Sequence, residues 1–461
     1  MAHRKSAQRA PAERRGIASA RPEALPEVIA ARIQAIGADG DGIARLPDGR
    51  PLYLPFTLPG ENVEARKLYA RGGGLGGEAI VLDPSAERVT PPCPHFGTCG
   101  GCTLQHWQID AIRRWKAGEL VQALTRAGFP NATVEATLAS APGTRRRVDL
   151  AFRRGPAGEQ LGFHAHRSRD IVPIAVCPVT EPAIVALLAP LGDLLPRLAA
   201  IHREAACIIN LLDSGPDLLL RTDADLNPAD RRLLAAFGAA QGIPRIAWAR
   251  GTGETEMAAQ LGPVRIILGG VEVAPPPGAF LQATATGASD IAAAVVAGLP
   301  EDIRARDRVV ELHAGSGTLT FALARKSRVH AYEGDAAAAL ALEQAAGHAG
   351  LHGNILVHRR DLARQPLGLA DFAGARAIVL DPPFAGAPDQ IEAVARSSVG
   401  RVIYVSCNPA ALSREVGLLR AAGFNLLQAT PIDQFVWSSR LESVVVLDRK
   451  VSTDRRFRPP R

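Results

Sequence analysis

Hydrophobic and polar positions in the last third of the chain predict a parallel α/β sheet. From about residue 286, short apolar runs end in glycine or acidic residues and are followed by stretches with helical spacing. This repetition is typical of a parallel sheet covered by helices on both faces. The apolar runs that predict strands are RVVELHA, RVHAYEG, ILVHRRD, AIVLDPP, RVIYVSC, NLLQATP and SVVVLDR. We therefore expect a seven-stranded Rossmann-like domain over residues 286–450.

Residues 25–87 show a different pattern, in which short apolar stretches alternate with Gly/Asp turns such as PDGR. Short strands at regular spacing predict a small OB-like β-barrel, a fold that binds nucleic acid on its open face. The segments GDGIA and LPGENVEA resemble a TRAM domain, an RNA-binding barrel. The resemblance implies that this segment contacts RNA.

The segment 88–285 mixes strand and helix patterns and is predicted to be a central α+β domain. Within it, TRRRVDLAFRRG (144–155) places five arginines around an alternating strand pattern, which predicts a strand with one strongly basic face. Arginines at alternating positions suit a surface that follows RNA phosphates. Solvated charge alone explains the same run, so both interpretations stay open.

Composition narrows the class of protein. The 461 residues suggest about three domains, and no apolar run is long enough to cross a bilayer. Lys and Arg number 53 against 46 Asp and Glu, and much of the excess lies in a basic arm (1–24) and a basic tail (451–461). A polyanionic partner is therefore plausible. Without a secretory h-region, we expect a cytoplasmic protein with no membrane association, working as a monomer.

Four of the six cysteines follow the pattern C-x5-C-x2-C with a distant fourth, namely Cys93, Cys99, Cys102 and Cys177. In a chain without secretory context, metal binding is favoured over disulfides. Four thiolates suit either a closed 4Fe-4S cluster or a tetrahedral zinc ion, and the spacing alone slightly favours zinc.

A candidate cofactor turn follows the strand RVVELHA, which contains Glu311. Gly315 and Gly317 lie where the strand passes into a helix, and a missing Cβ there lets the backbone approach a ligand. The third glycine of the dinucleotide fingerprint is absent, which argues against a pyrophosphate. Glu333 ends the next strand, where it can accept hydrogen bonds from ribose hydroxyls, and Asp361 follows a third strand near the expected adenine. These features favour an adenosyl cofactor over NAD.

Cys407 follows the strand RVIYVSC, and Asp381 follows the neighbouring strand AIVLDPP. Asn408 and Pro409 form a helix start signal, so the Cys407 thiol is predicted at a helix N-terminus, where the dipole favours thiolate. By contrast, Cys207 lies in an apolar run and is interpreted as a small core residue. Cys407 is therefore a candidate nucleophile.

Uracil C5 methylation requires chemistry of this kind. Because C5 is a poor nucleophile, a thiolate must first add to C6, after which C5 attacks the methyl donor and a base removes the C5 proton. Glu442, at the start of the last strand in FVWSSRLESVVVL, is the candidate base. Arg440 lies two residues earlier and is expected on the same strand face, where it would pair with Glu442. The alternative is that Arg440 points at an RNA phosphate and leaves Glu442 free, and the sequence does not decide between them.

Nearly all of the chain after the basic arm resembles the uracil-5 RNA methyltransferases of bacterial rRNA and tRNA. The marks are CPHFGTCGGCTLQHW with the later CPV, GAFLQATATG, ELHAGSGTLT, LDPPFAG, VSCNPAALSRE and DQFVWSSRLES. The resemblance implies S-adenosylmethionine as cofactor, Cys407 as nucleophile and Glu442 as base, with Gln282, Glu333 and Asp381 lining the cofactor and uracil sites. It also favours an iron-sulfur cluster over zinc, and large-subunit rRNA over tRNA as substrate.

Three positions depart from the family pattern: Thr284 replaces Asn, Phe384 replaces Arg and Arg440 replaces His. Two other functions therefore remain to be weighed. DPPF is also similar to the turn of amino-methyltransferases, in which an aromatic ring stacks on a flipped purine. A non-catalytic RNA-binding protein with a decayed site is the other alternative, which the intact cofactor turn and the Cys407 and Glu442 pair argue against.

Overall fold

The computed structural model describes residues 27–155 and 158–449, and the predicted basic arm and tail lie outside these ranges. The described residues divide into two compact units, one formed by residues 27–37 and 41–85, and the other by residues 38–40, 86–155 and 158–449. None of the helices in the described ranges is long and apolar enough to cross a membrane.

The N-terminal unit is a six-stranded sheet with the strand order β1-β5-β6-β4-β3-β2. Its strands are β1 (Val28–Arg32), β2 (Ala35–Ile36), β3 (Gly42–Arg45), β4 (Pro51–Leu54), β5 (Asn62–Arg71) and β6 (Gly74–Asp83). Leu52, Leu54 and Val63 are buried in its core. Since β1 and β2 are the two edges of this order, the small OB-like barrel that the sequence predicts is here a half-barrel sheet.

The central part of the second unit contains a seven-stranded sheet with the order β10-β9-β8-β11-β12-β13-β14. Its strands are β8 (Arg147–Gly155), β9 (Gly158–His164), β10 (Ile171–Pro173), β11 (Glu204–Leu212), β12 (Gly215–Thr222), β13 (Arg245–Arg250) and β14 (Glu256–Gln260). Its helices are α2 (Pro182–Val185), α3 (Leu188–Leu194), the 3-10 helix η1 (Leu195–Arg197) and α4 (Pro228–Gln241). Apolar side chains of the sheet and helices share one core.

The arginines of β8 do not form the single basic face expected from the sequence. Arg153 forms an ion pair with Glu204, and Arg154 forms one with Glu159. The side chains of Arg153 and Arg154 leave opposite faces of the strand, because consecutive strand residues alternate. Arg146, which precedes the strand, donates to the carbonyl of Gln282 instead (3.2 Å).

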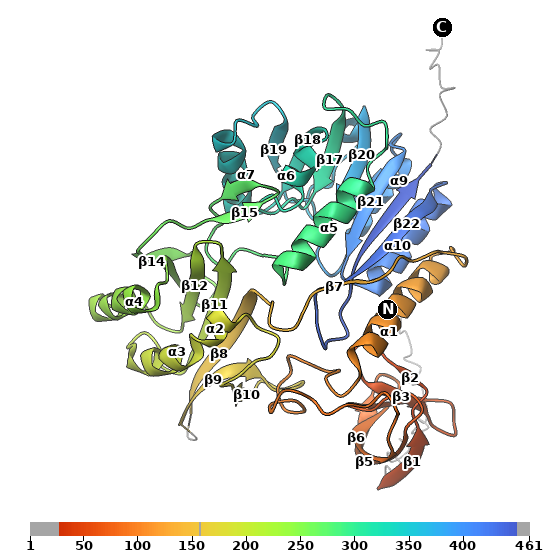
Figure 1. Cartoon of the computed structure of the whole chain (residues 1–461), viewed down its shortest axis with the longest axis vertical. Helices are drawn as coiled ribbons and strands as arrows, with labels where there is room; N and C mark the ends of the chain where they lie inside the picture. The colour runs from red at the N-terminus through yellow and green to blue at the C-terminus, as the bar shows by residue number, and fades with distance from the viewer. Residues whose placement is uncertain (1–26, 156–157, 450–461) are drawn as a thin grey trace, which may run out of the picture. The chain divides into compact units, whose positions relative to one another are not determined.

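The C-terminal part is an eight-stranded sheet with the order β19-β18-β17-β20-β21-β23-β22-β7 (Figure 1). The strands are β17 (Arg308–Leu312), β18 (Arg328–Glu333), β19 (Ile355–Arg359), β20 (Ala375–Leu380), β21 (Arg401–Ser406), β22 (Asn425–Asp433), β23 (Glu442–Asp448) and β7 (Leu138–Ala139). The first five in this order are parallel, and β23 runs antiparallel between β21 and β22. All seven predicted strands are present, and β7 adds an eighth from earlier in the chain.

Helices cover both faces of this sheet, as the repeated strand–helix pattern predicts. The helices are α1 (Ile109–Arg126), α5 (Ala285–Ala297), α6 (Thr320–Ala324), α7 (Ala336–His348), α8 (Leu369–Phe372), α9 (Pro388–Arg396) and α10 (Pro409–Ala421). One core packs α5, α6 and α7 against the sheet, with Leu268 and Val273 of the hairpin β15 (Ile266–Leu268) and β16 (Val271–Val273). The other core contains α1, α8, α9 and α10.

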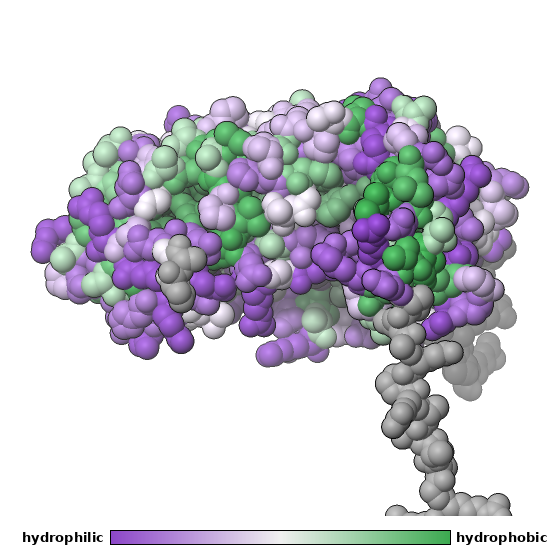
Figure 2. All heavy atoms as spheres, turned by 90° about the horizontal axis from the view of Figure 1, so that it is seen from below, coloured by the Kyte–Doolittle hydropathy of each residue, from purple (hydrophilic) through white to green (hydrophobic). Residues whose placement is uncertain are grey.

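The parallel strands end at one edge of the sheet, where ligands bind in open α/β folds. Strand β17 lies between β18, which follows it in the chain, and β20, which comes later in the chain. The ends of β17 and β20 therefore form the topological switch point, at which open α/β sheets bind their ligands. On the face shown in Figure 2, hydrophobic residues are interspersed among hydrophilic ones.

A buried ion pair fixes helix α1 to the loop that joins β22 to β23. Lys116 donates from Nζ to Asp433 Oδ1 (2.6 Å) and to the carbonyl of Phe435 (2.9 Å). Lys116 is 1% exposed and Asp433 2%. Burial lowers the pKa of Lys116, and the adjacent carboxylate opposes that shift. Because a lone charge at this depth is costly, each partner depends on the other.

We expect Lys116→Met to lower the free energy of unfolding by about 3–5 kcal/mol, because the Asp433 carboxylate is then buried without a cation. Arg113→Gln is the matched control, since it removes an ion pair with exposed Asp110 on the same helix and should cost roughly 0–1 kcal/mol. Urea titration measures both values. Equal losses in the two variants would contradict the role given to the buried pair.

Candidate active site

Cys407 lies directly after β21 and is half-buried. Asn408 caps the following helix, because its side-chain oxygen accepts from the N–H groups of Ala410 (3.0 Å) and Ala411 (3.4 Å). Pro409 is the first residue of α10. The predicted helix start is therefore confirmed, and the thiol stands at the N-terminus of α10, at the edge where the parallel strands end.

The register of β21 with β23 brings Glu442 beside Cys407. Ser406 is paired with Ser443 in this antiparallel ladder, and Ser443 Oγ donates to the carbonyl of Ser406 (3.0 Å). In an antiparallel pair the next positions outward face each other. Cys407 and Glu442 occupy these positions, so a thiol and a carboxyl group from opposite strand ends become neighbours.

Hydrogen bonds between side chains connect Glu442 with Asp381, the residue that follows β20. Gln434 donates from Nε2 to Gln282 Oε1 (2.6 Å) and to Glu442 Oε2 (3.1 Å). Gln282 in turn donates to Asp381 Oδ2 (3.2 Å). Gln282, Gln434 and Glu442 are buried, at 5%, 2% and 4% exposure. Two amides therefore hold two carboxyl groups in fixed orientations beside the thiol.

The thiol and the two carboxyl groups titrate far from their ordinary ranges. Burial raises the pKa of Asp381 to about 7, and burial together with nearby Asp381 raises the pKa of Glu442 well above its ordinary value. Burial and the carboxylates of Glu442 and Asp381 raise the pKa of Cys407 to about 11. Desolvation and neighbouring negative charge therefore oppose the helix dipole, which is expected to favour the thiolate.

Arg440 does not share a strand face with Glu442, because β23 begins only at Glu442 and Arg440 belongs to the loop before it. Its guanidinium carbon instead lies 4.4 Å from the centre of the Phe384 ring. The expected ion pair between Arg440 and Glu442 is therefore not formed, and two of the three departures from the family pattern contact each other.

Thr284, the third departure, is a helix cap. Its side-chain oxygen accepts from the N–H of Gly287 at the start of α5 (2.9 Å) and shares a hydrogen bond with Ser140 (2.6 Å). Because Thr and Asn both serve as N-caps, Thr284 can replace Asn without loss of the cap. The cap of α5 is therefore present in this chain.

The predicted cofactor turn after β17 is hydrogen-bonded to a carboxylate at the end of β18. Glu333 accepts from the N–H of Gly315 (2.7 Å) and from that of Asp335 (2.7 Å). Gly315 has φ +56°, a conformation that favours glycine, and the space where its Cβ would lie is open. Gly317, at φ +103°, instead faces Phe321 and Leu342, so the missing Cβ there makes room for core side chains and not for a ligand.

Glu311, near the end of β17, is 1% exposed, and its Oε2 has no hydrogen-bond partner among the residues that the structure describes. Burial raises the pKa of this carboxyl to about 8, and the carboxylates of Asp381 and Glu333 add to the shift. Glu311 thus lies between the cofactor turn and the Cys407 site. An unpaired buried acceptor at this position suits a ligand that supplies a donor.

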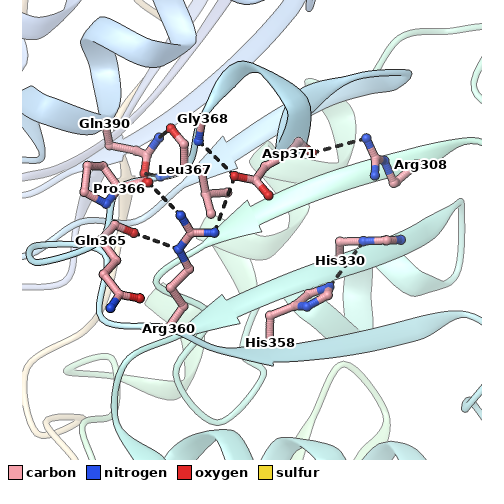
Figure 3. A network of polar contacts seen from close by, with 10 residues as sticks. All are labelled: Arg308, His330, His358, Arg360, Gln365, Pro366, Leu367, Gly368, Asp371 and Gln390. Carbon is pink, nitrogen blue, oxygen red and sulfur yellow. Dashed lines mark hydrogen bonds and ion pairs between the residues drawn. The ribbon is translucent and has the colours of Figure 1, made fainter.

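Asp361 lies in an ordered turn after β19. A Cβ on Gly334 would lie 3.4 Å from the Asp361 Cα, so the turn is next to Glu333. Arg360 organises the following chain by donating to the carbonyls of Gln365 (2.8 Å) and Pro366 (2.8 Å) and pairing with Asp371 (3.4 Å), as Figure 3 shows. The structure therefore brings Gly315, Glu333 and Asp361 together, as predicted.

The four clustered cysteines line one cavity of about 640 Å³: Cys93, Cys99, Cys102 and Cys177. All four thiols are free of disulfides, and burial raises the pKa of Cys102 to about 12. Across the described ranges, no group of three or more His, Cys, Asp and Glu side chains is arranged to hold a metal ion. The cavity extends to Phe435 and Arg440, in the loop before Glu442.

Sequence reasoning missed Gln434 and Lys116. Gln434 lies in DQFVWSSRLES, which carries the family resemblance, but nothing in the pattern marks an amide that contacts both Gln282 and Glu442. Lys116 stands among the charged residues of an ordinary helix sequence, IDAIRRWKAGEL. Both roles depend on contacts between segments far apart in the chain, which a local pattern does not contain.

Fold and site together define a class. Strands β17 to β23 have the sheet order of a methyltransferase, in which the antiparallel strand β23 lies between β21 and β22. The site adds a glycine turn with an acidic partner, and a cysteine beside a carboxyl group. These features describe an RNA-modifying methyltransferase preceded by a TRAM domain. The TRAM sequence profile matches residues 27–75, and the profile of the tRNA (Uracil-5-)-methyltransferase family matches residues 279–450.

Individual relatives agree with this class. The chain is 40% identical to an uncharacterized RNA methyltransferase of Mesorhizobium japonicum, over 90% of this chain and 97% of the relative. It is 32% identical to the 23S rRNA (uracil(1939)-C(5))-methyltransferase RlmD of Chromohalobacter salexigens, over 94% and 92% of the two chains. The chain therefore belongs to the RNA uracil-5-methyltransferase family.

A solved structure shares the fold. The tRNA (uracil-54, C5)-methyltransferase of Pyrococcus abyssi, in complex with S-adenosyl-L-homocysteine, superposes with a TM-score of 0.70 at 19% identity. The match covers 91% of this chain and 100% of that one. At this identity the likeness supports the shared architecture only.

Proposed function

We propose that this enzyme transfers a methyl group from S-adenosylmethionine to C5 of a uracil in large-subunit rRNA, through a covalent bond between Cys407 and uracil C6. The observation that carries the proposal is the placement of Cys407 next to Glu442, which follows from the pairing of Ser406 with Ser443. Amino-methyltransfer through the DPPF turn gives neither residue a role, and it is set aside.

Glu311 and Glu333 support a cofactor site at the ends of β17 and β18. Glu311 Oε2 is a buried acceptor without a partner among the described residues, suited to the amino group of the cofactor. Glu333 keeps acceptor capacity for ribose hydroxyls beyond its two backbone contacts. When bound, S-adenosylmethionine supplies an electrophilic methyl group on a sulfonium sulfur.

Cys407 must lose its proton before the sulfur adds to C6, because burial and the nearby carboxylates raise its pKa to about 11. We propose that the thiol proton passes to Asp381, because burial raises the pKa of this carboxyl to about 7. Protonation of Asp381 also removes one of the two negative charges that oppose thiolate formation, while Glu442 stays a carboxylate and remains available as a base. Gln282 and Asp381 are then the polar groups available to the uracil edge.

Glu442 is the proposed base that removes the C5 proton after methyl transfer. Its raised pKa makes its carboxylate a stronger base than an exposed glutamate, and the absence of an ion pair with Arg440 preserves that basicity. Gln434 fixes one carboxyl oxygen, so the other can point toward the substrate. Once the C5 proton moves to Glu442, the bond between C6 and sulfur breaks and the thiolate leaves.

The proposed RNA partner is large-subunit rRNA, and tRNA is the alternative. The relative at 32% identity that covers most of the chain acts on 23S rRNA by its name. The structure named for tRNA shares the fold at 19% identity, which carries less weight for substrate choice.

The cysteine cavity is the proposed site of a 4Fe-4S cluster ligated by Cys93, Cys99, Cys102 and Cys177. The donor set fits, because four free thiols with no competing disulfide line one cavity. Tetrahedral zinc uses the same four donors and is the competing assignment. The proposed role is structural, since methyl transfer requires no electron.

We expect Cys407 to form a stable adduct with rRNA that contains 5-fluorouracil, because fluorine at C5 cannot be removed as a proton. A denaturing gel should show a slow band only when the methyl donor is present. Cys407→Ala should abolish the band, whereas Cys207→Ala should keep it, because Cys207 is a fully buried core residue. Adduct formation by the Cys407→Ala variant would refute the covalent mechanism.

Glu442→Gln should accumulate a methylated covalent adduct on ordinary uracil substrate. Addition of the thiolate and methyl transfer do not require removal of the C5 proton, but release of the enzyme does. The adduct is detected with a labelled methyl donor on a denaturing gel, and turnover should fall by about 10²–10⁴-fold, the usual contribution of a positioned base. Turnover near the wild-type rate without a trapped species would assign the base to another group.

Protein purified without oxygen should be brown, with the broad absorption at about 400 nm that thiolate-ligated iron clusters generally show. Cys99→Ser should lose this colour because it removes one of four proposed ligands, while Cys207→Ser should retain it. Elemental analysis provides the decisive comparison. One zinc per chain in a colourless preparation would replace the iron assignment.

A further inference from the structure

Phe384 and Arg440 lie together beside the nucleophile, although they come from different loops. Phe384 follows Pro383 in the turn after β20, and Arg440 precedes β23. The guanidinium carbon of Arg440 is 4.4 Å from the ring centre of Phe384. Phe384 is 49% exposed, a large fraction for an aromatic residue beside a buried site. Arg440 is also exposed, and it acts electrostatically on Cys407, so the pair borders the reaction centre.

The backbone on both sides of this pair is fixed. Asn408, the cap of α10, donates from its side-chain amide to the carbonyl of Phe384 (2.8 Å), and Arg414 donates to the carbonyl of Ala385 (3.4 Å). The N–H of Arg440 is bound by Ser438 Oγ (3.1 Å). Two exposed side chains are thus presented from anchored turns, which lowers the entropic cost of ordering them on a ligand.

Arg440 forms no ion pair with a carboxylate within the described part of the chain. A guanidinium stacked on a ring keeps its N–H donors free at the edge, in a geometry that suits phosphate oxygens. The uncovered part of the Phe384 ring offers an apolar surface of the kind on which nucleobases stack. Together they offer one site for a base and one for a phosphate.

We propose that Phe384 and Arg440 form a clamp for the nucleotide adjacent to the target uridine, with the base stacked on Phe384 and the phosphate bound by Arg440. This inference rests on the proposed function, because it requires RNA at the Cys407 site.

The test uses the full-length enzyme and an rRNA transcript that contains 5-fluorouridine, with covalent adduct formation as the readout. Titrating the RNA separates the half-saturating concentration from the maximal rate of adduct formation, and titrating salt gives the number of phosphates neutralised. The variants are Phe384→Ala, Phe384→Tyr, Arg440→Gln and Arg440→Lys. Arg420→Gln is the matched control, because Arg420 is exposed at the far end of α10 and lies 5.3 Å from the Phe129 ring centre.

The clamp predicts that Phe384→Ala raises the half-saturating RNA concentration about tenfold, as loss of one stacked base does, and leaves the maximal rate unchanged. Phe384→Tyr should restore binding. Arg440→Gln should reduce the slope of log affinity against log salt by about one, whereas Arg440→Lys should keep it. Arg420→Gln should match the wild type in both measurements.

Two results would overturn the clamp while adducts still form. One is a lower maximal rate with unchanged half-saturation in Arg440→Gln, which would mean that Arg440 acts on the thiol. The other is an equal effect of Arg420→Gln, which would reduce the role of Arg440 to general surface charge. If the wild-type enzyme forms no adduct at all, the proposed function fails, and the clamp fails with it.

Discussion

The site depends on one constraint, the antiparallel insertion of β23 between β21 and β22. The parallel strands place residues that follow their carboxyl ends, such as Cys407 after β21, at one edge of the sheet. Because β23 runs in the opposite direction, its first residue lies at the same edge. The pairing of Ser406 with Ser443 determines that this residue is Glu442. A slip by one position would replace Glu442 and turn its neighbours to the opposite face. The position of Glu442 beside Cys407 is therefore determined by backbone pairing and not by side-chain contacts alone.

Segments distant in the sequence support the loop that leads into this strand. Lys116 of α1 holds Asp433 and the carbonyl of Phe435, and the N–H groups of Thr103 and Leu104, beside Cys102, both bind the carbonyl of Trp437 (3.0 Å each). The cysteine cavity and the proposed base thus share one loop. A cluster bound by these cysteines would order the loop without taking part in methyl transfer.

The sequence predicted the elements whose signals are local. Apolar periodicity located all seven methyltransferase strands, and Asn408 with Pro409 located the start of α10. Features that depend on tertiary contacts were missed or predicted wrongly. Periodicity gives no sign that β7 joins the sheet or that Gln434 bridges Gln282 and Glu442. The dipole argument for Cys407 considered its own helix, whereas its pKa is governed by burial and by carboxylates from other strands.

The buried acidic environment of the thiol, formed by residues from separate strands, joins these features into one account. Its central claim is uracil-5 methylation that requires Cys407. The most direct measurement is mass-spectrometric mapping of 5-methyluridine in rRNA and tRNA from cells that lack the gene, with wild-type or Cys407→Ala copies restored. The account predicts loss of one rRNA modification, regained with the wild-type copy only. Unchanged 5-methyluridine in rRNA and tRNA, or full rescue by Cys407→Ala, would contradict it.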